Sequence, residues 1–166
     1  MTLLGIVLVL SAPGGVDFLA PQSAVACGGC DCSGYLLALI AATAEHEQAQ
    51  ANVETAKQAL ERAKQAVEDA KEALNDAITY AQACALAYAA ALELGNQWLI
   101  EATATELAKA LVDVLWKTHL LANAEKNLEQ AQENYDAAVE AERVAWEHYV
   151  DALMAYAECK SNCPNG

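Results

Sequence analysis

Two long stretches without helix-breaking residues, joined at a single glycine, constrain this chain more than any other feature. Between Tyr35 and Asn162 the sequence contains one glycine, Gly95, and no proline. That glycine divides the region into two Ala-rich parts of nearly equal length, and alanine has the highest helix propensity of all residues. Each part would form a helix of about 60 residues, roughly 90 Å long at 1.5 Å per residue. The sequence therefore predicts a single fold-back at Gly95 and Asn96.

A heptad repeat runs through both predicted helices, with larger residues at one position and alanine at the position three residues later. In the first helix the larger residues are Val53, Leu60, Val67 and Leu74, and the alanines are Ala56, Ala63, Ala70 and Ala77. In the second they are Leu121, Leu128, Tyr135, Tyr149 and Tyr156, with Ala124, Ala131, Ala138, Ala145 and Ala152. This pattern is typical of a coiled coil. We predict an all-α fold, a long antiparallel two-helix coiled-coil hairpin with helices at 35–94 and 97–161.

Antiparallel packing also predicts the register, because facing residues should have numbers that add up to about 191. In this register each larger residue meets an alanine, which lets the helices approach to the short end of the usual ~8 to 10 Å interaxial range. The same register places Cys32 opposite Cys159, although nothing in the alanine pattern requires cysteines there. Packing and cysteine placement thus support one fold.

Residues that favour helix ends lie where this fold needs them. Gly95 suits the left-handed position after a helix, and Asn96 is a good N-cap for the second helix. Asp31 or Ser33 can cap the first helix, and a tail at 162–166 with Pro164 stops the second. In the alternative, a compact four-helix bundle, each arm would turn midway, but neither arm has a glycine or proline there.

Residues 1–26 resemble an export signal. An apolar run at 3–10 is followed by Ala24-Val25-Ala26, whose small residues match the pattern that a signal peptidase recognises. The stretch also resembles a bacterial lipoprotein signal, in which the cysteine after the cleavage point, here Cys27, carries the lipid. We therefore expect a secreted or cell-surface protein.

Two features depart from both signal patterns. No Lys or Arg precedes Lys57, so the basic leader is missing, and Asp17 lies close to the expected cleavage point. The alternative is an uncleaved apolar arm that packs on the hairpin or anchors it. Its apolar run is too short to span a membrane as a helix, which needs about 20 residues.

Five of the six cysteines gather at the predicted open end of the hairpin. Three lie in a segment at 27–34, two lie near the C-terminus, and Cys84 lies alone on the seam. In an oxidising compartment we expect disulfides between Cys32 and Cys159 and between Cys30 and Cys163. Cys27 would then remain for a lipid or for a bridge to another chain, and Cys84 is most simply a small buried apolar residue.

The same cysteine cluster permits a second interpretation. Cys-Gly-Gly-Cys-Asp-Cys opposite Cys-Lys-Ser-Asn-Cys brings up to five thiolates together, enough for tetrahedral zinc or for copper(I). Spacing alone does not exclude this soft-metal site. We favour disulfides, with no metal or other cofactor, because the export signal indicates the compartment and the register provides the geometry.

One polar pair is predicted within the apolar seam. His46 occupies a seam position opposite Ala145, and Glu142, also on the seam, lies one helical step away. The two could pair across the helices. Polar contacts at such positions fix the register more often than they catalyse reactions.

The region around the turn is apolar on every face. Ala83 to Leu92 are ten apolar residues in a row, and the apolar character continues past the turn. One partner helix cannot cover all of these side chains, so we expect contacts with further chains. The predicted contact residues are Leu86, Tyr88, Leu92, Trp98, Leu99, Ile100 and Trp116. A second apolar stripe near the open end, formed by Val139, Trp146 and Leu153, is likewise expected to contact further chains.

The net charge of the chain and the lack of known catalytic motifs argue against several classes of function. A formal charge of −14 argues against nucleic acid or an anionic membrane surface as the main partner. The sequence has no phosphate loop, nucleophile elbow or His-Glu-x-x-His, and a two-helix seam offers no pocket for a small-molecule substrate. We expect no enzyme but an exported structural or adhesive hairpin that self-associates into homo-oligomers or acts as a spacer. The alternatives are a zinc- or copper-binding protein and a membrane-active hairpin with an apolar tip.

Overall fold

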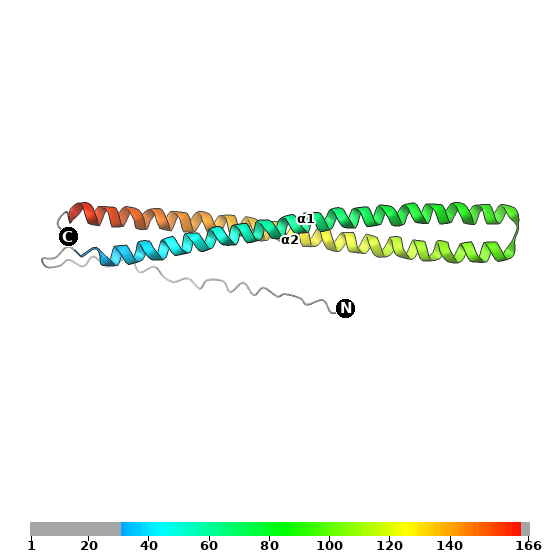
Figure 1. Ribbon diagram of the computed structural model, residues 1–166, viewed down its shortest axis with the longest axis horizontal. Coiled ribbons are helices and arrows are strands. Elements are labelled where there is room, and N and C mark those ends of the chain that lie inside the picture. Colours follow the sequence, from blue (N-terminus) through cyan, green and yellow to red (C-terminus); the bar gives the residue numbers. More distant parts are fainter. Residues whose placement is uncertain (1–30, 164–166) are drawn as a thin grey trace.

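The computed structural model describes residues 31–163, which form one long helical hairpin (Figure 1). Helix α1 spans Ser33–Leu94 with 62 residues, and helix α2 spans Gln97–Asn162 with 66 residues. The two helices run antiparallel and lie side by side along their whole length, and no strand occurs within 31–163. The predicted fold is confirmed, and the helix boundaries lie within two residues of the predicted ones.

The helices change sides once along the rod (Figure 1). A heptad repeat has a period of 3.5 residues, slightly shorter than the 3.6 residues of a straight helical turn. Two helices that keep such a seam in contact must therefore wind around each other. The visible crossing is the supercoil that the repeat predicts.

The turn consists of Gly95 and Asn96. Gly95 has a φ of 66°, the left-handed conformation that a residue without Cβ adopts at no steric cost, and its N–H donates to the Leu92 carbonyl oxygen at 3.1 Å. The Asn96 side chain accepts a hydrogen bond from the Leu99 N–H at 3.2 Å, which makes it the N-cap of α2. Both residues have the roles expected from the sequence.

At the open end, α1 begins without a side-chain cap from its N-cap residue, Cys32. The carboxylate of Asp31 instead accepts a hydrogen bond from the Ser33 N–H at 2.9 Å. The Ser33 side chain, and to a smaller degree this N–H, lower the pKa of Asp31 below its ordinary value, because hydrogen bonds to the carboxylate stabilise its charged form. Of the two expected capping residues, Asp31 supplies the side-chain oxygen.

The core is a thin seam between the helices. Buried hydrophobic residues within 31–163 are mainly alanines, and Leu60 and Val67, each 5% exposed, are the larger ones. The alanines are Ala42, Ala49, Ala77, Ala81, Ala91, Ala110 and Ala145. The other large residues of the predicted seam, such as Leu74 and Leu128, are half-buried. A two-helix seam leaves one side of each large residue near solvent, so the hairpin buries little apolar surface for its length.

Candidate assembly surfaces and the cysteine end

A disulfide joins the two helices at the open end. Cys32 and Cys159, 127 residues apart in sequence, are bonded, and their Cα atoms lie 6.0 Å apart. This is the pair that the alanine register places face to face. Cys163 is disulfide-bonded as well. Its expected partner Cys30, like Cys27 and the whole export segment, lies outside the described residues.

The sulfur atoms of Cys32, Cys159 and Cys163 lie within 4.8 Å of one another. Three sulfurs at this spacing could ligate a soft metal as thiolates, but all three belong to disulfide-bonded cysteines. A metal could bind here only after reduction. Next to the sulfurs is an open depression of about 250 Å³, smaller than the ~300 Å³ at the lower end of ligand pockets. Its lining includes Asp31, Leu36, Tyr156 and Lys160.

The predicted polar pair occurs in the seam. His46 Nε2 and a Glu142 carboxylate oxygen are 2.9 Å apart, and since a carboxylate only accepts, the histidine nitrogen donates. The His46 side chain is 13% exposed and that of Glu142 is 32% exposed. The imidazole ring also stacks on Tyr149 with ring centres 5.9 Å apart and contacts Trp146 at 5.1 Å. This enclosure fits a role in setting the register of the helices.

Two more interactions link the helices, one on each side of the seam. Glu45 and His148 approach each other to 3.6 Å, and Lys71 is close enough to Glu125 for that carboxylate to raise the pKa of the lysine. The larger cause of that rise is the ion pair with Glu68 in the same helix. Each cross-helix pair joins residues at equivalent heptad positions, as expected for an antiparallel coiled coil.

Cys84 is a half-buried free cysteine on the seam. Its thiol, hydrogen-bonded to Tyr80, raises the pKa of that phenol. The two residues lie one helical turn apart on the same helix. Nothing in this arrangement indicates a catalytic thiol.

The predicted tip contacts fall into two groups. Leu86, Leu92, Trp98 and Trp116 are 50–75% exposed and available for further contacts. The second group, Tyr88, Leu99 and Ile100, is half-buried within the hairpin itself. A large part of the tip's hydrophobic surface thus remains uncovered by the partner helix.

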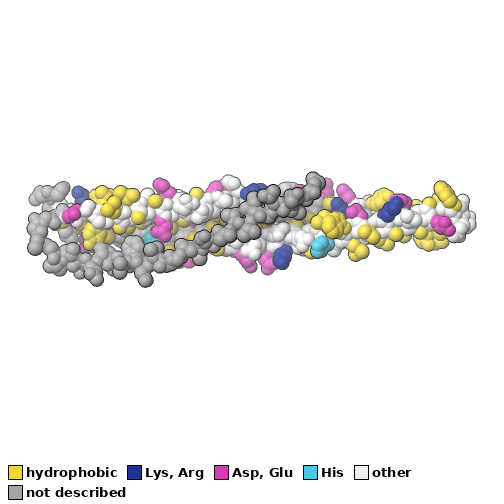
Figure 2. All heavy atoms as spheres, turned by 90° about the horizontal axis from the view of Figure 1, so that it is seen from below, with side chains coloured by type: hydrophobic (Ala, Val, Ile, Leu, Met, Phe, Trp, Pro, Cys, Tyr) yellow, Lys and Arg dark blue, Asp and Glu magenta, His cyan; other side chains and the backbone are white. Residues whose placement is uncertain are grey.

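Exposed hydrophobic residues concentrate at the two ends of the rod. We call residues 78–120 the tip section, and residues 41–77 together with 121–138 the middle section. Eleven large hydrophobic side chains are exposed in the tip section and none in the middle section. They are Ile78, Tyr80, Leu86, Leu92, Leu94, Trp98, Leu111, Val112, Leu115, Trp116 and Leu120. The view in Figure 2 likewise shows hydrophobic side chains gathered toward the ends.

Seven of these eleven residues were not among the predicted contacts, including Leu111 and Leu115, which are 51% and 71% exposed. Their heptad positions, just beside the seam, could have identified them. The sequence pattern showed that the tip is apolar on every face, but it did not single out the side on which the bulky residues lie together.

By length and composition alone, α1 contains an 18-residue stretch apolar enough to cross a membrane. Only 22% of that stretch is buried in the hairpin. Core helices of soluble proteins and export signals meet the same criterion, so it supports the membrane alternative only weakly.

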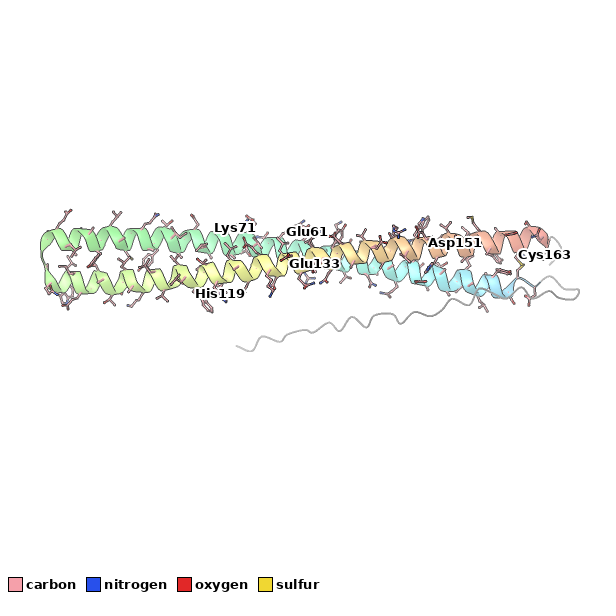
Figure 3. All side chains as sticks on the ribbon, turned by 180° about the vertical axis from the view of Figure 1, so that it is seen from behind. Glu61, Lys71, His119, Glu133, Asp151 and Cys163 are labelled. Carbon is pink, nitrogen blue, oxygen red and sulfur yellow. A yellow bond between two sulfur atoms is a disulfide. The ribbon has the colours of Figure 1, made fainter. Side chains whose placement is uncertain are left out.

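Charged residues dominate the middle section. Figure 3 shows Glu61, Lys71 and Glu133 around the middle of the rod, and Cys163 at its open end. Twelve acidic and five basic residues lie in this section, against four acidic and two basic ones in the somewhat shorter tip section. Ion pairs within one helix, such as Lys64 with Glu61 at 2.8 Å, are exposed and contribute little stability.

Comparison with known proteins adds no family to this description: no protein-family model, curated protein or solved structure is detectably similar to the chain.

Proposed function

We propose that this protein is an exported structural or adhesive rod that self-associates through its apolar tip section. The observation that carries the proposal is the set of eleven exposed large hydrophobic residues in the tip section. Single exposed hydrophobic residues are common, but so many in one section, with none exposed in the middle section, indicate an interaction site. The long hairpin gives such a site a fixed place at one end of a spacer.

The disulfides support the exported location. Disulfides persist in oxidising compartments and are rare in the cytosol, where thiols are kept reduced. The Cys32–Cys159 bond closes the end of a rod whose seam buries few large side chains. A covalent link at this point limits fraying of the two helix ends that the turn does not join.

Light scattering on the protein purified without detergent tests self-association. We expect a defined oligomer with a mass that is a whole multiple of the 17.6 kDa chain mass, or of the processed chain if the export segment is removed. Monomer alone at micromolar concentration would contradict the proposal. Intact mass of the natively exported protein, with and without reductant, would report cleavage before Cys27, a lipid and the number of disulfides.

The soft-metal alternative rests on the three sulfurs within 4.8 Å. It predicts stoichiometric zinc or copper in protein purified without reductant, measured by elemental analysis. Absence of both metal and free thiols at the open end would remove it.

The membrane alternative rests on the apolar stretch of α1. Glu93, Glu101 and Glu106 make deep insertion of the tip costly. This alternative predicts liposome binding that is lost when Leu92 and Trp98 are changed to charged residues. Equal binding by that variant would exclude a tip-specific insertion.

A further inference from the structure

We propose that a second copy of this chain docks antiparallel on one particular side of the tip section, with its turn pointing in the opposite direction. This inference rests on the proposed self-association and specifies its surface and geometry. It follows from the placement of bulky, small and charged residues on the two broad sides of the hairpin.

An antiparallel two-helix coiled coil has two broad sides, one on each side of the seam. Equivalent heptad positions of the two helices flank the same side. Glu45 and His148 lie on one side of the seam, and Lys71 and Glu125 lie on the other. Extending the heptads of Lys71 and Glu125 into the tip section defines the side that we call the apolar side. Its residues there are Ile78, Gln82, Ala85, Ala89, Leu92, Glu101, Ala104, Ala108, Leu111 and Leu115.

The opposite side of the tip section carries more charge. It has Glu106, Lys109 and Asp113 beside hydrophobic residues such as Tyr80 and Trp116. Lys109 and Glu106 form an ion pair at 2.7 Å, and both influence the pKa of Tyr80 across the seam. Glu101, by contrast, is the only charged residue among the ten of the apolar side. Burial against another chain would therefore cost much less on the apolar side.

The apolar side has a bulky part and a small part. Ile78, Leu111 and Leu115, which are 39%, 51% and 71% exposed, lie at one level of the rod. Between this level and Leu92, which is 50% exposed beside the turn, the residues are mainly alanines, Ala85 and Ala89 on α1 and Ala104 and Ala108 on α2. A surface with a bulky patch next to a shallow patch can pack on a second copy of itself. A two-fold axis between the two patches places the bulky patch of each copy on the shallow patch of the other.

The positions of the two patches fix the stagger. A two-fold axis that crosses the rod at the level of Gln82 on α1 and Lys109 on α2 places α1 on α1 of the second copy and α2 on its α2. Ile78 then packs on Ala85 of the second copy, and Leu111 and Leu115 pack on Ala108 and Ala104 of the second copy. The same rule of large residue against alanine that joins α1 to α2 would join one hairpin to the next.

Charge and area agree with this arrangement. The axis brings Glu101 to the level of Lys117 of the second copy, a half-buried residue of the seam that borders the apolar side. The two tips overlap by about 40 Å at 1.5 Å per residue, over a width of two helices of about 10 Å each. The resulting ~800 Å² per copy equals the area of a standard stable protein interface. Lys71 lies at the edge of the overlap and Glu125 lies just beyond it, so the charged middle section limits further sliding.

A matched pair of substitutions tests the proposal on the full chain with its disulfides intact. Leu115 and Leu86 are 71% and 73% exposed, lie in the same section, and differ in that Leu86 is outside the apolar side. We expect Leu115→Glu to weaken association at least 100-fold by sedimentation, because a carboxylate would be buried against alanines, while Leu86→Glu changes it less than threefold. Circular dichroism would verify that both variants keep the helical content of the parent.

The outcomes separate the inference from the proposed function. A parent protein that is monomeric throughout would overturn both. A parent oligomer that survives Leu115→Glu, or that is lost equally in both variants, would overturn the proposed surface while self-association stands. Binding of the parent to neutral phosphatidylcholine vesicles in place of self-association would assign the apolar side to lipid and overturn the inference.

Cross-linking gives an independent test of the stagger. In a Cys84→Ala background, Gln82→Cys would lie at the two-fold axis, whereas Thr79→Cys lies on the outer edge of α1. Mild oxidation with diamide should convert the Gln82→Cys protein into a covalent dimer at least ten times faster than the Thr79→Cys protein. Equal rates would contradict an axis at this level.

Discussion

The middle and tip sections share one seam but differ outside it. Both continue the heptads that hold α1 against α2, with buried residues such as Leu60 in the middle and Ala110 near the tip. The outer surface of the middle section is charged, whereas the tip section exposes eleven large hydrophobic residues. The comparison teaches that the seam forms the rod, while the residues outside the seam decide where the rod can meet another molecule.

The difference also explains why the two sections should respond differently to mutation. A substitution in the seam of the middle section removes contacts within one chain and should lower its stability. A substitution on the exposed surface of the tip section should leave the isolated hairpin intact and alter association.

The largest effect should follow from removing the disulfides at the open end of the hairpin. Replacing Cys32, Cys159 and Cys163 by Ser should lower the free energy of unfolding by about 3 to 5 kcal/mol, because no disulfide between the helix ends then restricts the 127-residue loop in the unfolded chain. Tip association should persist, since the disulfides lie at the other end of the rod. Denaturant titration would measure stability, and light scattering would measure association. Loss of the oligomer at full helical content would contradict association through the tip section.

A matched pair of leucines separates the seam from the surface. Leu60→Ala should destabilise the hairpin by about 2 to 3 kcal/mol, since the side chain is only 5% exposed. Leu86→Ala, at a side chain that is 73% exposed, should change stability by less than about 0.5 kcal/mol. Thermal and denaturant unfolding of both variants, measured at one protein concentration, would test this. Equal losses would show that the tip residue is buried in the native state.

A smaller effect is expected at the polar pair of the seam. Glu142→Ala should cost about 1 to 2 kcal/mol, because it leaves the half-enclosed His46 without its carboxylate acceptor. Changing His46 and Glu142 together to Leu should restore stability, yet loosen the register that the pair specifies. Cross-helix distances between spin labels would show the loosening as a broader distribution. A double variant with an unchanged distribution would assign the register to the alanine pattern alone.

The smallest effect concerns the start of α1. Hydrogen bonds from the Ser33 side chain and from its N–H lower the pKa of Asp31, so these contacts stabilise the fold above the carboxyl's ordinary value near 3.8 and are lost as pH falls through the lowered value. Asp31→Asn should remove this pH dependence below pH ~4 and increase fraying of the first turn. Hydrogen exchange at Leu36, whose N–H donates to the Cys32 carbonyl, would report it. Identical exchange in both proteins across this pH range would contradict a role for Asp31.

The sequence was sufficient to predict most of the fold because few residues interrupt it. One glycine in the left-handed conformation, an asparagine cap and an unbroken heptad left a single antiparallel solution, and the Cys32–Cys159 bond has the register that alanine packing requires. The pairing of His46 with Glu142 followed from the same register.

The association surface was less predictable from the sequence. Tyr88, Leu99 and Ile100 are apolar residues at the tip, but only the structure shows that the hairpin half-buries them. Conversely, the exposure of Leu111 and Leu115 depends on which side of the seam their heptad positions face. Hydrophobicity identified the section, whereas three-dimensional placement identified the side.

The length of the oligomer in solution tests the central claim most directly. Small-angle X-ray scattering of the parent should give a rod of doubled mass and about 150 Å in length, since two hairpins of about 95 Å overlap only at their tips. The Leu115→Glu variant, which carries the same N-terminal residues, should give a rod about 50 Å shorter. A parent rod of doubled mass but no greater length than the variant would show that the hairpins pair along their middle sections, and would contradict the account.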